Sequence, residues 1–371
     1  MAAAILAACK KENREAPSAT PVNLHVFYTN DLSGEIDLCG CPSHNMGGVS
    51  RRAQFLERFI TLQEPMLQVD AGNGFFREVP NDYRVSPMDR ERALVLAKAA
   101  ARLEVDALNV GWQDLAAGPE FLLELQEKAK ARGELNLISS NLYGKDTDKP
   151  LFPTERIIER NGLRIGIFGL CRPGEGLAPA LLVRDPAQAA KAMVKKLRKE
   201  KQADLVIGLF NLGLAESAKL CEQVSGIDLA VVSGLPQFLW NPQLTGQTLL
   251  LQSGMGGKYL GQLDLQYHPG KKPKDQRKEL KRLKKELHRV STRIGDTEAQ
   301  MKDNPSLQAQ YNDLVNDKAG IEQKLKAMQS LPFDYKFALA PMDANLPVDN
   351  EIAGWVRQVL NPQLNPAPVK P

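Results

Sequence analysis

The feature that most constrains the fold is a repeated order of apolar strand-like runs and helix-like segments between residues 22 and 268. Runs such as residues 105–110 and 203–209 have the length and composition of buried strands, and segments with helical spacing of apolar residues follow them. This order predicts a parallel or mixed β-sheet covered by helices, and therefore an α/β fold.

Small and polar residues follow two of these runs. Residues 22–27 lead into the sequence YTNDLSG (residues 28–34), and residues 66–69 lead into DAGNG (residues 70–74). Loops after the carboxyl ends of strands are where α/β proteins usually carry functional residues. We therefore expect Asp31 and its neighbours to lie at the functional end of the sheet.

A helical hairpin is predicted within this α/β unit. Apolar residues recur at three- and four-residue spacing in residues 280–301 and again in residues 307–328, on either side of a break that contains Pro305. The expected organisation has four parts: residues 1–21 as a lipoprotein signal remnant and tether, residues 22–269 plus 333–361 as the α/β domain, residues 270–332 as an inserted antiparallel coiled-coil hairpin, and residues 362–371 as a flexible tail.

The first arm of this hairpin is strongly basic, with ten Lys or Arg among the nineteen residues 271–289. A solvated helix face with i,i+4 pairs of Glu and Lys explains such a run. A contact with anionic lipid headgroups or with a protein partner is the alternative. The net charge of +4 is too small to indicate a nucleic-acid partner.

The N-terminal sequence MAAAILAAC (residues 1–9) resembles a bacterial lipobox, whose cysteine is acylated after signal cleavage. It implies lipidation at Cys9 and an envelope protein that is anchored in the membrane and faces the periplasm or the exterior. The apolar run is short and lacks a basic segment before it, so a buried N-terminal helix with an ordinary cysteine is the alternative. No other stretch reaches the ~18 apolar residues that a membrane span needs.

A cysteine-containing loop follows Asp31, with the sequence DLCGCPSH at residues 37–44. Cys39, Cys41 and His44 could hold a soft metal such as zinc or act as a redox pair, and Cys171, which ends another strand-like run, could face the same side. The alternative is a disulfide, or two ordinary thiols, in a long loop.

The motifs at the strand ends are similar to those of the secreted, UshA-like 5'-nucleotidases in the calcineurin-like metallophosphatase superfamily. T-N-D-x-H-G corresponds to residues 29–34, D-A-G-D to residues 70–73, and Q-A-G…G-x-Y-L-G to residues 252–261. The resemblance implies a four-layer α/β/β/α sandwich. It also implies loops that would carry a two-metal phosphoesterase centre.

Most of the ligand and catalytic positions implied by this resemblance are substituted. Ser33 replaces a His, Asn73 the bridging Asp, Asn211 a His, and G-N-H-E and G-H-x-H become GWQD (residues 111–114) and GLPQ (residues 234–237). The degenerate metal-site positions are therefore Asp31, Ser33, Asn73, Trp112, Gln113, Asn211, Leu235 and Gln237, and Asp31 alone among them keeps the family residue.

These substitutions predict an envelope-anchored pseudoenzyme without catalytic residues, which acts as a binding or scaffold protein. One alternative is a thiol-redox or soft-metal protein that uses Cys39 and Cys41. A weaker alternative is a divergent phosphoester hydrolase with a site rebuilt around Asp31, Asp70, Asn73 and Asp114. No cofactor is expected, and a divalent zinc or manganese ion is the choice if one binds. The expected partners are the membrane, through the lipid anchor, and a protein at the hairpin; the sequence does not identify a small-molecule ligand.

Overall fold

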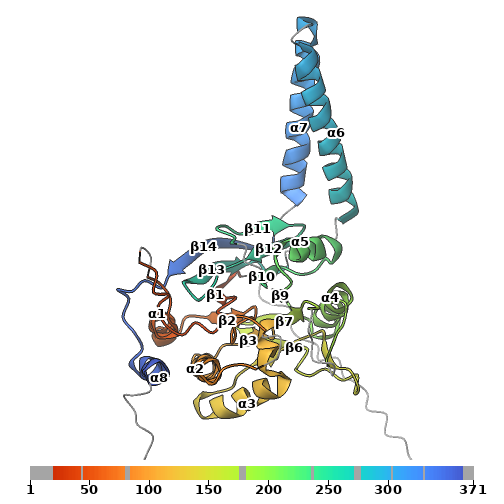
Figure 1. Cartoon of the computed structure of the whole chain (residues 1–371). Coiled ribbons are helices and arrows are strands. Elements are labelled where there is room, and N and C mark those ends of the chain that lie inside the picture. The colour runs from red at the N-terminus through yellow and green to blue at the C-terminus, as the bar shows by residue number, and fades with distance from the viewer. Residues whose placement is uncertain are drawn as a thin grey trace, which may run out of the picture.

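The computed structural model describes residues 20–42, 45–79, 84–174, 181–234, 238–270, 277–301, 304–328 and 331–361. Two six-stranded sheets lie at its centre (Figure 1). The first sheet has the spatial order β14 (Phe333–Pro341), β13 (Tyr259–Tyr267), β1 (Val22–Thr29), β2 (Met66–Asp70), β3 (Ala107–Asn109) and β4 (Leu137–Ile138). The pairs from β1 to β4 are parallel, whereas β13 pairs antiparallel with both β1 and β14.

The second sheet is parallel in its centre and antiparallel at both edges. Its order is β11 (Gln243–Thr245), β12 (Thr248–Leu251), β10 (Leu229–Ser233), β9 (Leu205–Asn211), β7 (Leu163–Cys171) and β6 (Glu155–Arg160). Every residue of β9 is buried, as is usual for a strand inside a parallel sheet. A separate antiparallel pair joins β5 (Leu142–Gly144) and β8 (Leu181–Val183).

The faces of β1 show how the core is divided. Leu24, Val26 and Tyr28 point into an apolar cluster that also contains Ile165 of β7, so this cluster lies between the two sheets. Phe27 points to the opposite face, because successive side chains of a strand alternate.

Helices cover the outer face of each sheet. Phe27 belongs to a cluster with residues of α1 (Val49–Thr61), α2 (Pro87–Arg102), α3 (Pro119–Ala129) and α8 (Asn350–Leu360). Residues of α4 (Pro186–Lys195) and α5 (Leu214–Gln223) pack on the second sheet. Short helical turns lie at Gln113–Ala117, Lys130–Arg132, Lys196–Glu200 and Pro305–Leu307. The mixed α/β fold expected from the sequence is confirmed.

Two long helices, α6 (Arg277–Met301) and α7 (Gln308–Met328), lie side by side and project away from the sheets (Figure 1). In the chain, these helices lie between β13 and β14. The two strands pair with each other along their whole length. Leu283 of α6 and Leu314 and Ile321 of α7 are buried. Lys284 Nζ on α6 lies 2.8 Å from Oε1 of Glu222 on α5. No helix in the described part of the chain is long and apolar enough to cross a membrane.

Candidate functional site: a closed polar network beside a thiol cavity

The loops after β1 and β2 leave the first sheet at the same edge, because Thr29 pairs in parallel with Asp70. The backbone of Asp31, Ser33 and Asn73 has positive φ values of 49°, 55° and 58°. Non-glycine residues rarely adopt this conformation, and they concentrate at functional sites. The two loops therefore share a backbone conformation that is uncommon outside glycine, which makes this edge a candidate functional site.

Asp31 lies at the centre of this edge and is 4% exposed. Its Oδ1 accepts hydrogen bonds from Asn73 Nδ2 and from the backbone N–H of Gly234, both at 3.0 Å. Its Oδ2 accepts one from Asn30 Nδ2, also at 3.0 Å. Burial raises the pKa of Asp31 to about 6, although these donors favour the ionised form. Both carboxylate oxygens thus already have protein partners.

Asp114 joins the loop after β2 to the loop after β3. Its Oδ2 accepts from the backbone N–H groups of Asn73 and Gly111, both at 2.8 Å, and its Oδ1 accepts from that of Phe75 at 2.9 Å. Asn73 Oδ1 in turn accepts from the backbone N–H of Gln113 at 3.0 Å. Asp114 is fully buried, and this burial raises its pKa to about 7.

Asn211, at the end of β9, is fixed in the same way. Its Oδ1 accepts from the backbone N–H of Trp112 at 2.8 Å, and its Nδ2 donates to Ser233 Oγ at 2.9 Å. Ser233 Oγ donates to the carbonyl of Ala71 at 2.7 Å. We call the side chains of Asp31, Asn73, Asp114, Asn211 and Ser233 the polar network.

The other degenerate positions that the structure describes lie outside the polar network. Ser33 Oγ donates to the carbonyl of Asp31 at 3.2 Å, and the Trp112 indole is buried in the apolar cluster of the first sheet. A Cβ atom on Gly174 would lie 2.4 Å from that ring, so Trp112 fills the space next to this glycine. Leu235 and Gln237 lie outside the described residues, as do Cys9 and His44.

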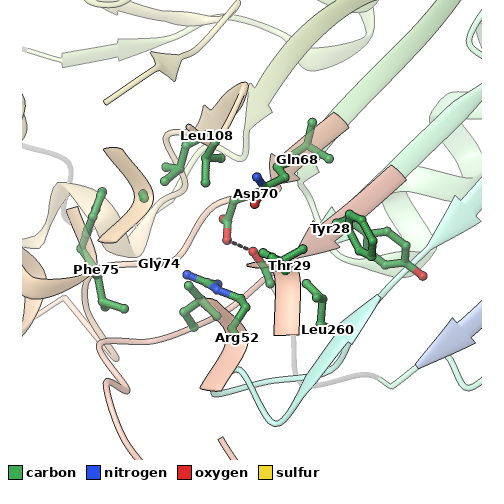
Figure 2. A pocket seen from close by; sticks show the side chains of 16 residues that line it. Tyr28, Thr29, Arg52, Gln68, Asp70, Gly74, Phe75, Leu108 and Leu260 are labelled. Carbon is green, nitrogen blue, oxygen red and sulfur yellow. Dashed lines mark hydrogen bonds between the residues drawn. The ribbon is translucent and has the colours of Figure 1, made fainter. Parts of the chain in front are cut away.

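Asp70 lies behind the loops, at the small cavity of about 30 Å³ in Figure 2. It accepts hydrogen bonds from Thr29 Oγ1 and from the backbone N–H of Gly72. The buried Arg52 of α1 points toward this pair. Burial raises the pKa of Asp70, and the positive charge of Arg52 opposes that rise. Asp70 therefore supports the loops from behind, and no sequence motif had indicated the role of Arg52.

The residues at this edge do not fit a two-metal phosphoesterase centre. Such a centre needs carboxylate and imidazole ligands that converge on two cations. Asn73 and Asn211 instead direct their amide oxygens at backbone N–H groups. Within the described ranges, no group of three or more His, Cys, Asp or Glu side chains is placed to hold a metal ion.

A second feature lies next to the polar network, in the loop after β1. The sulfur atoms of Cys39 and Cys41 are 2.7 Å apart and do not form a disulfide. The Nζ of Lys258 lies 3.8 Å from Cys41 Sγ. Cys39 is anchored by a hydrogen bond from its N–H to the carbonyl of Met46 at 3.0 Å. The two thiols open into a cavity of about 570 Å³, the thiol cavity, lined by Ser33, Glu35, Cys39, Cys41, Arg77, Phe238, Trp240, Gly254, Met255, Gly256, Lys258 and Tyr259.

Cys171 is not brought to this cavity. It is fully buried at the end of β7, its thiol donates to the carbonyl of Arg172 at 3.4 Å, and burial raises its pKa to about 12. The cause is that both faces of β7 are covered, so a residue at its end need not reach the surface. The aromatic side chains of the thiol cavity were missed in the sequence, because no motif links residues 238–240 to the cysteine loop.

No family model matches the chain. A 5'-nucleotidase from Vibrio vulnificus is 21% identical over 303 residues, which cover 72% of the chain and 53% of that protein. Protein UshA from Yersinia enterocolitica is 27% identical over 139 residues, covering 34% of the chain and 24% of that protein. The chain thus spans about half the length of the first of these curated relatives, and the match to the second is shorter.

Solved structures give the same result for the fold. A 5'-nucleotidase precursor from Thermus thermophilus aligns with a TM-score of 0.64 and 19% identity over 92% of the chain and 59% of that structure. The calcineurin-like phosphoesterase YfkN from Bacillus subtilis aligns with a TM-score of 0.58 and 14% identity over 93% and 98%. The chain is a homologue of the 5'-nucleotidases and has the calcineurin-like phosphoesterase fold.

Proposed function

We propose that the chain is a binding or scaffold protein of the bacterial envelope that has lost two-metal phosphoester hydrolysis. The observation that carries this proposal is the hydrogen bond from Asn73 Nδ2 to Asp31 Oδ1. It joins the position of the bridging carboxylate to the remaining acidic ligand position, in the place where two cations would have to be held.

The polar network resists conversion into a metal site. Coordination by Asp31 would displace hydrogen bonds from Asn30, Asn73 and Gly234. Each buried donor left without an acceptor costs about 1–3 kcal/mol. A neutral amide at position 73 also cannot balance two dications as a carboxylate does. If a zinc or manganese ion binds at all, Asp31 is the one carboxylate that the sequence retains at the family's ligand positions.

The test combines metal analysis with activity assays on the purified protein. We expect less than one transition-metal ion per chain after dialysis, and no turnover of phosphomonoesters or phosphodiesters with added Mn²⁺ or Zn²⁺. Asp31→Ala is the matched variant. Two bound metal ions together with turnover that Asp31→Ala abolishes would overturn the proposal and favour a rebuilt hydrolase site that includes Asp70 and Asp114.

We also propose that Cys9 is lipidated and anchors the protein in the envelope. The support is the lipobox-like sequence at residues 1–9. In a bacterial host, the protein should fractionate with membranes and incorporate labelled fatty acid, and Cys9→Ser should release it. A soluble, unlabelled wild-type protein would contradict the anchor.

The proposed contact surface for a protein partner is the pair of helices α6 and α7. These helices project from the sheets (Figure 1), and most of the exposed residues described on them are polar. Cross-linking from α6 in the intact envelope should capture a partner. Capture that is unchanged when the basic residues of α6 are replaced would contradict this assignment.

Thiol chemistry at Cys39 and Cys41 is the second candidate function. The observation that favours it is the distance of 2.7 Å between the two sulfur atoms. Redox chemistry fits better than soft-metal binding, because the described residues offer no third metal-binding side chain beside the two sulfur atoms, and zinc prefers a four-coordinate shell. This candidate does not depend on the state of the polar network.

A further inference from the structure

We propose that Cys39 and Cys41 form a dithiol centre that reduces an organic disulfide bound in the thiol cavity. This inference deepens the second candidate function and does not depend on the loss of hydrolysis. It specifies the attacking sulfur, the resolving sulfur and the chemical class of the substrate.

The geometry of the two thiols supports the exchange. Their sulfur atoms lie side by side, 2.7 Å apart, on one short loop, so a disulfide bond can form between them by local adjustment of that loop. Both residues are partly exposed and line the cavity, so a substrate can reach them. Cys171 and Cys221 are buried and lie outside it.

The surroundings distinguish the two sulfurs. The hydrogen bond with Cys41 lowers the pKa of Cys39 to about 7, and backbone hydrogen bonds at Met46 and Cys41 and the charge of Lys258 act in the same direction. The same pairing raises the pKa of Cys41, while the charge and the hydrogen bond of Lys258 oppose that rise. Because the thiolate is the nucleophile in exchange, Cys39 attacks and Cys41 resolves.

The cavity can hold a substrate that is apolar in one part and anionic in another. Phe238 and Trp240 form an edge-to-face pair with ring centroids 4.0 Å apart, and Tyr259 lies about 6 Å from both. Trp240 is 63% exposed and Met255 48% exposed, an unusual surface unless something packs on it. Lys258 supplies a positive charge beside the sulfurs, and Arg77 supplies another that Glu35 partly balances.

The reaction is balanced as two exchanges. The Cys39 thiolate attacks one sulfur of the substrate disulfide, so a bond from Cys39 to that sulfur forms while the substrate S–S bond breaks, and the first substrate thiolate leaves and takes up a proton from solvent. Cys41 then gives its proton to solvent, and its thiolate attacks Cys39 Sγ and releases the second substrate thiolate. The substrate gains two electrons and becomes two thiols, and Cys39 and Cys41 become a disulfide. A dithiol reductant restores them by the reverse exchange.

The test uses the full chain in a Cys9→Ser background, reduced and freed of reductant. The probe is dithiobis(nitrobenzoate), an aromatic disulfide with carboxylates, whose thiol product is followed by absorbance. We expect about two equivalents of product per folded chain, with loss of two hydrogens from the protein by mass, because resolution by Cys41 releases the second equivalent. Unfolded protein has four accessible thiols and provides the count of total cysteine.

Two matched variants separate the roles. Cys39→Ser should slow the first release by about 100-fold or more, since the remaining thiol has the higher pKa. Cys41→Ser should keep the first release within about three-fold of the parent but stop at one equivalent, with a stable mixed disulfide on Cys39. Equal single release from both variants, or a parent that carries two probe groups and forms no internal disulfide, would overturn the inference.

Further arms identify the source of the disulfide and keep the two functions apart. A rate that saturates with oxidised glutathione indicates a low-molecular-weight substrate, and one that saturates with a disulfide-bonded peptide indicates a polypeptide substrate. If the rate saturates with none of dithiobis(nitrobenzoate), oxidised glutathione and the peptide, binding in the cavity is overturned. All arms contain a metal chelator. Phosphoesterase activity would overturn the proposed loss of hydrolysis without affecting exchange, and failure of exchange would leave that loss untouched.

Discussion

The polar network and the thiol cavity lie next to each other but differ in how their reactive groups are satisfied. In the polar network, the carboxylates of Asp31 and Asp114 and the amides of Asn73 and Asn211 are buried and bonded to protein groups. In the thiol cavity, two thiols, a lysine and three aromatic rings line a space of about 570 Å³. The polar groups of the network are directed at one another, whereas the thiols line a space that an external molecule can enter.

The two regions share their supporting loops. Asn30 Nδ2 donates both to Asp31 and to the carbonyl of Gly254, while Asn30 Oδ1 accepts from Ser253. The backbone N–H of Gly256 donates to the carbonyl of Asp31 at 2.8 Å. Gly254 and Gly256 line the thiol cavity. The polar network thus serves as the rigid support of the cavity, and substitutions in either region test this relation.

The largest expected effect comes from removing the acceptor at the centre of the loops. Asp114→Ala leaves the buried N–H groups of Asn73, Phe75 and Gly111 without this partner, so we expect a loss of about 4 kcal/mol in the free energy of unfolding. Denaturant unfolding measures it. The control is Asp343→Ala, which removes one exposed backbone contact at Asn345 and should change stability little. Equal losses in the two variants would mean that the polar network is not a structural support.

Restoring the bridging carboxylate should destabilise the protein. Asn73→Asp replaces a hydrogen bond of 3.0 Å to Asp31 by two facing carboxylates, at a cost of about 2–3 kcal/mol at neutral pH. The pKa of Asp31 in the fold, about 6, already lies above its unfolded value. The contribution of Asp31 to the free energy of unfolding is therefore fully present below its unfolded pKa and is lost as the pH rises through about 4 to 6. Asn73→Asp should show a steeper loss over this range than the parent protein.

Unfolding of Asn73→Asp with added metal ions tests whether this substitution recreates a metal site. Added Mn²⁺ or Zn²⁺ should not restore the stability of Asn73→Asp, because Ser33 and Asn211 still supply no imidazole. A ligand that binds the folded state stabilises it in proportion to the logarithm of its concentration over Kd. A stability gain that grows with metal concentration would show that one substitution recreates a metal site, and would contradict the proposed loss.

Much of the fold was accessible from the sequence because local patterns determine it. The buried strand β9, predicted over residues 203–209, follows from its apolar composition. The Asn161–Gly162 sequence is typical of a tight turn, and in the structure it joins β6 to β7, where Arg160 pairs with Leu163. The motifs also indicated which loops meet, and the structure brings Asp31, Asn73 and Asn211 into one network.

The rest depends on contacts between distant parts of the chain. Lys258 lies beside Cys41 although 217 positions separate them, and no local signal encodes that contact. The burial of Cys171 follows from how neighbouring elements cover β7, which periodicity within one strand cannot show. Sequence motifs therefore indicated which positions to examine, while the partners of each side chain had to come from the fold.

Replacing Lys258, the positive charge beside the two thiols, should have a smaller effect. Lys258→Met keeps the length of the side chain and removes a charge that lowers the pKa of Cys39. We expect the midpoint of the pH profile for Cys39 alkylation to rise from about 7 by roughly half a pH unit, which slows the reaction about two- to three-fold at neutral pH. An unchanged profile would exclude Lys258 as a positioning residue. Lys336→Met, on β14 outside the cavity, is the control.

The smallest effect is expected at the exposed rim. Trp240→Ala removes an aromatic surface that is 63% exposed and packs on Phe238, but it leaves both thiols in place. Binding of an aromatic disulfide should weaken about three- to ten-fold while the rate at saturation stays the same, because an aromatic contact of this kind contributes about 1 kcal/mol. Separate determination of KM and kcat for dithiobis(nitrobenzoate) measures this split, and Trp355→Ala on α8 is the matched aromatic control. A fall in kcat without a change in KM would mean that Trp240 shapes the cysteine loop instead of holding the substrate, and the cavity would then lose its role as the binding site.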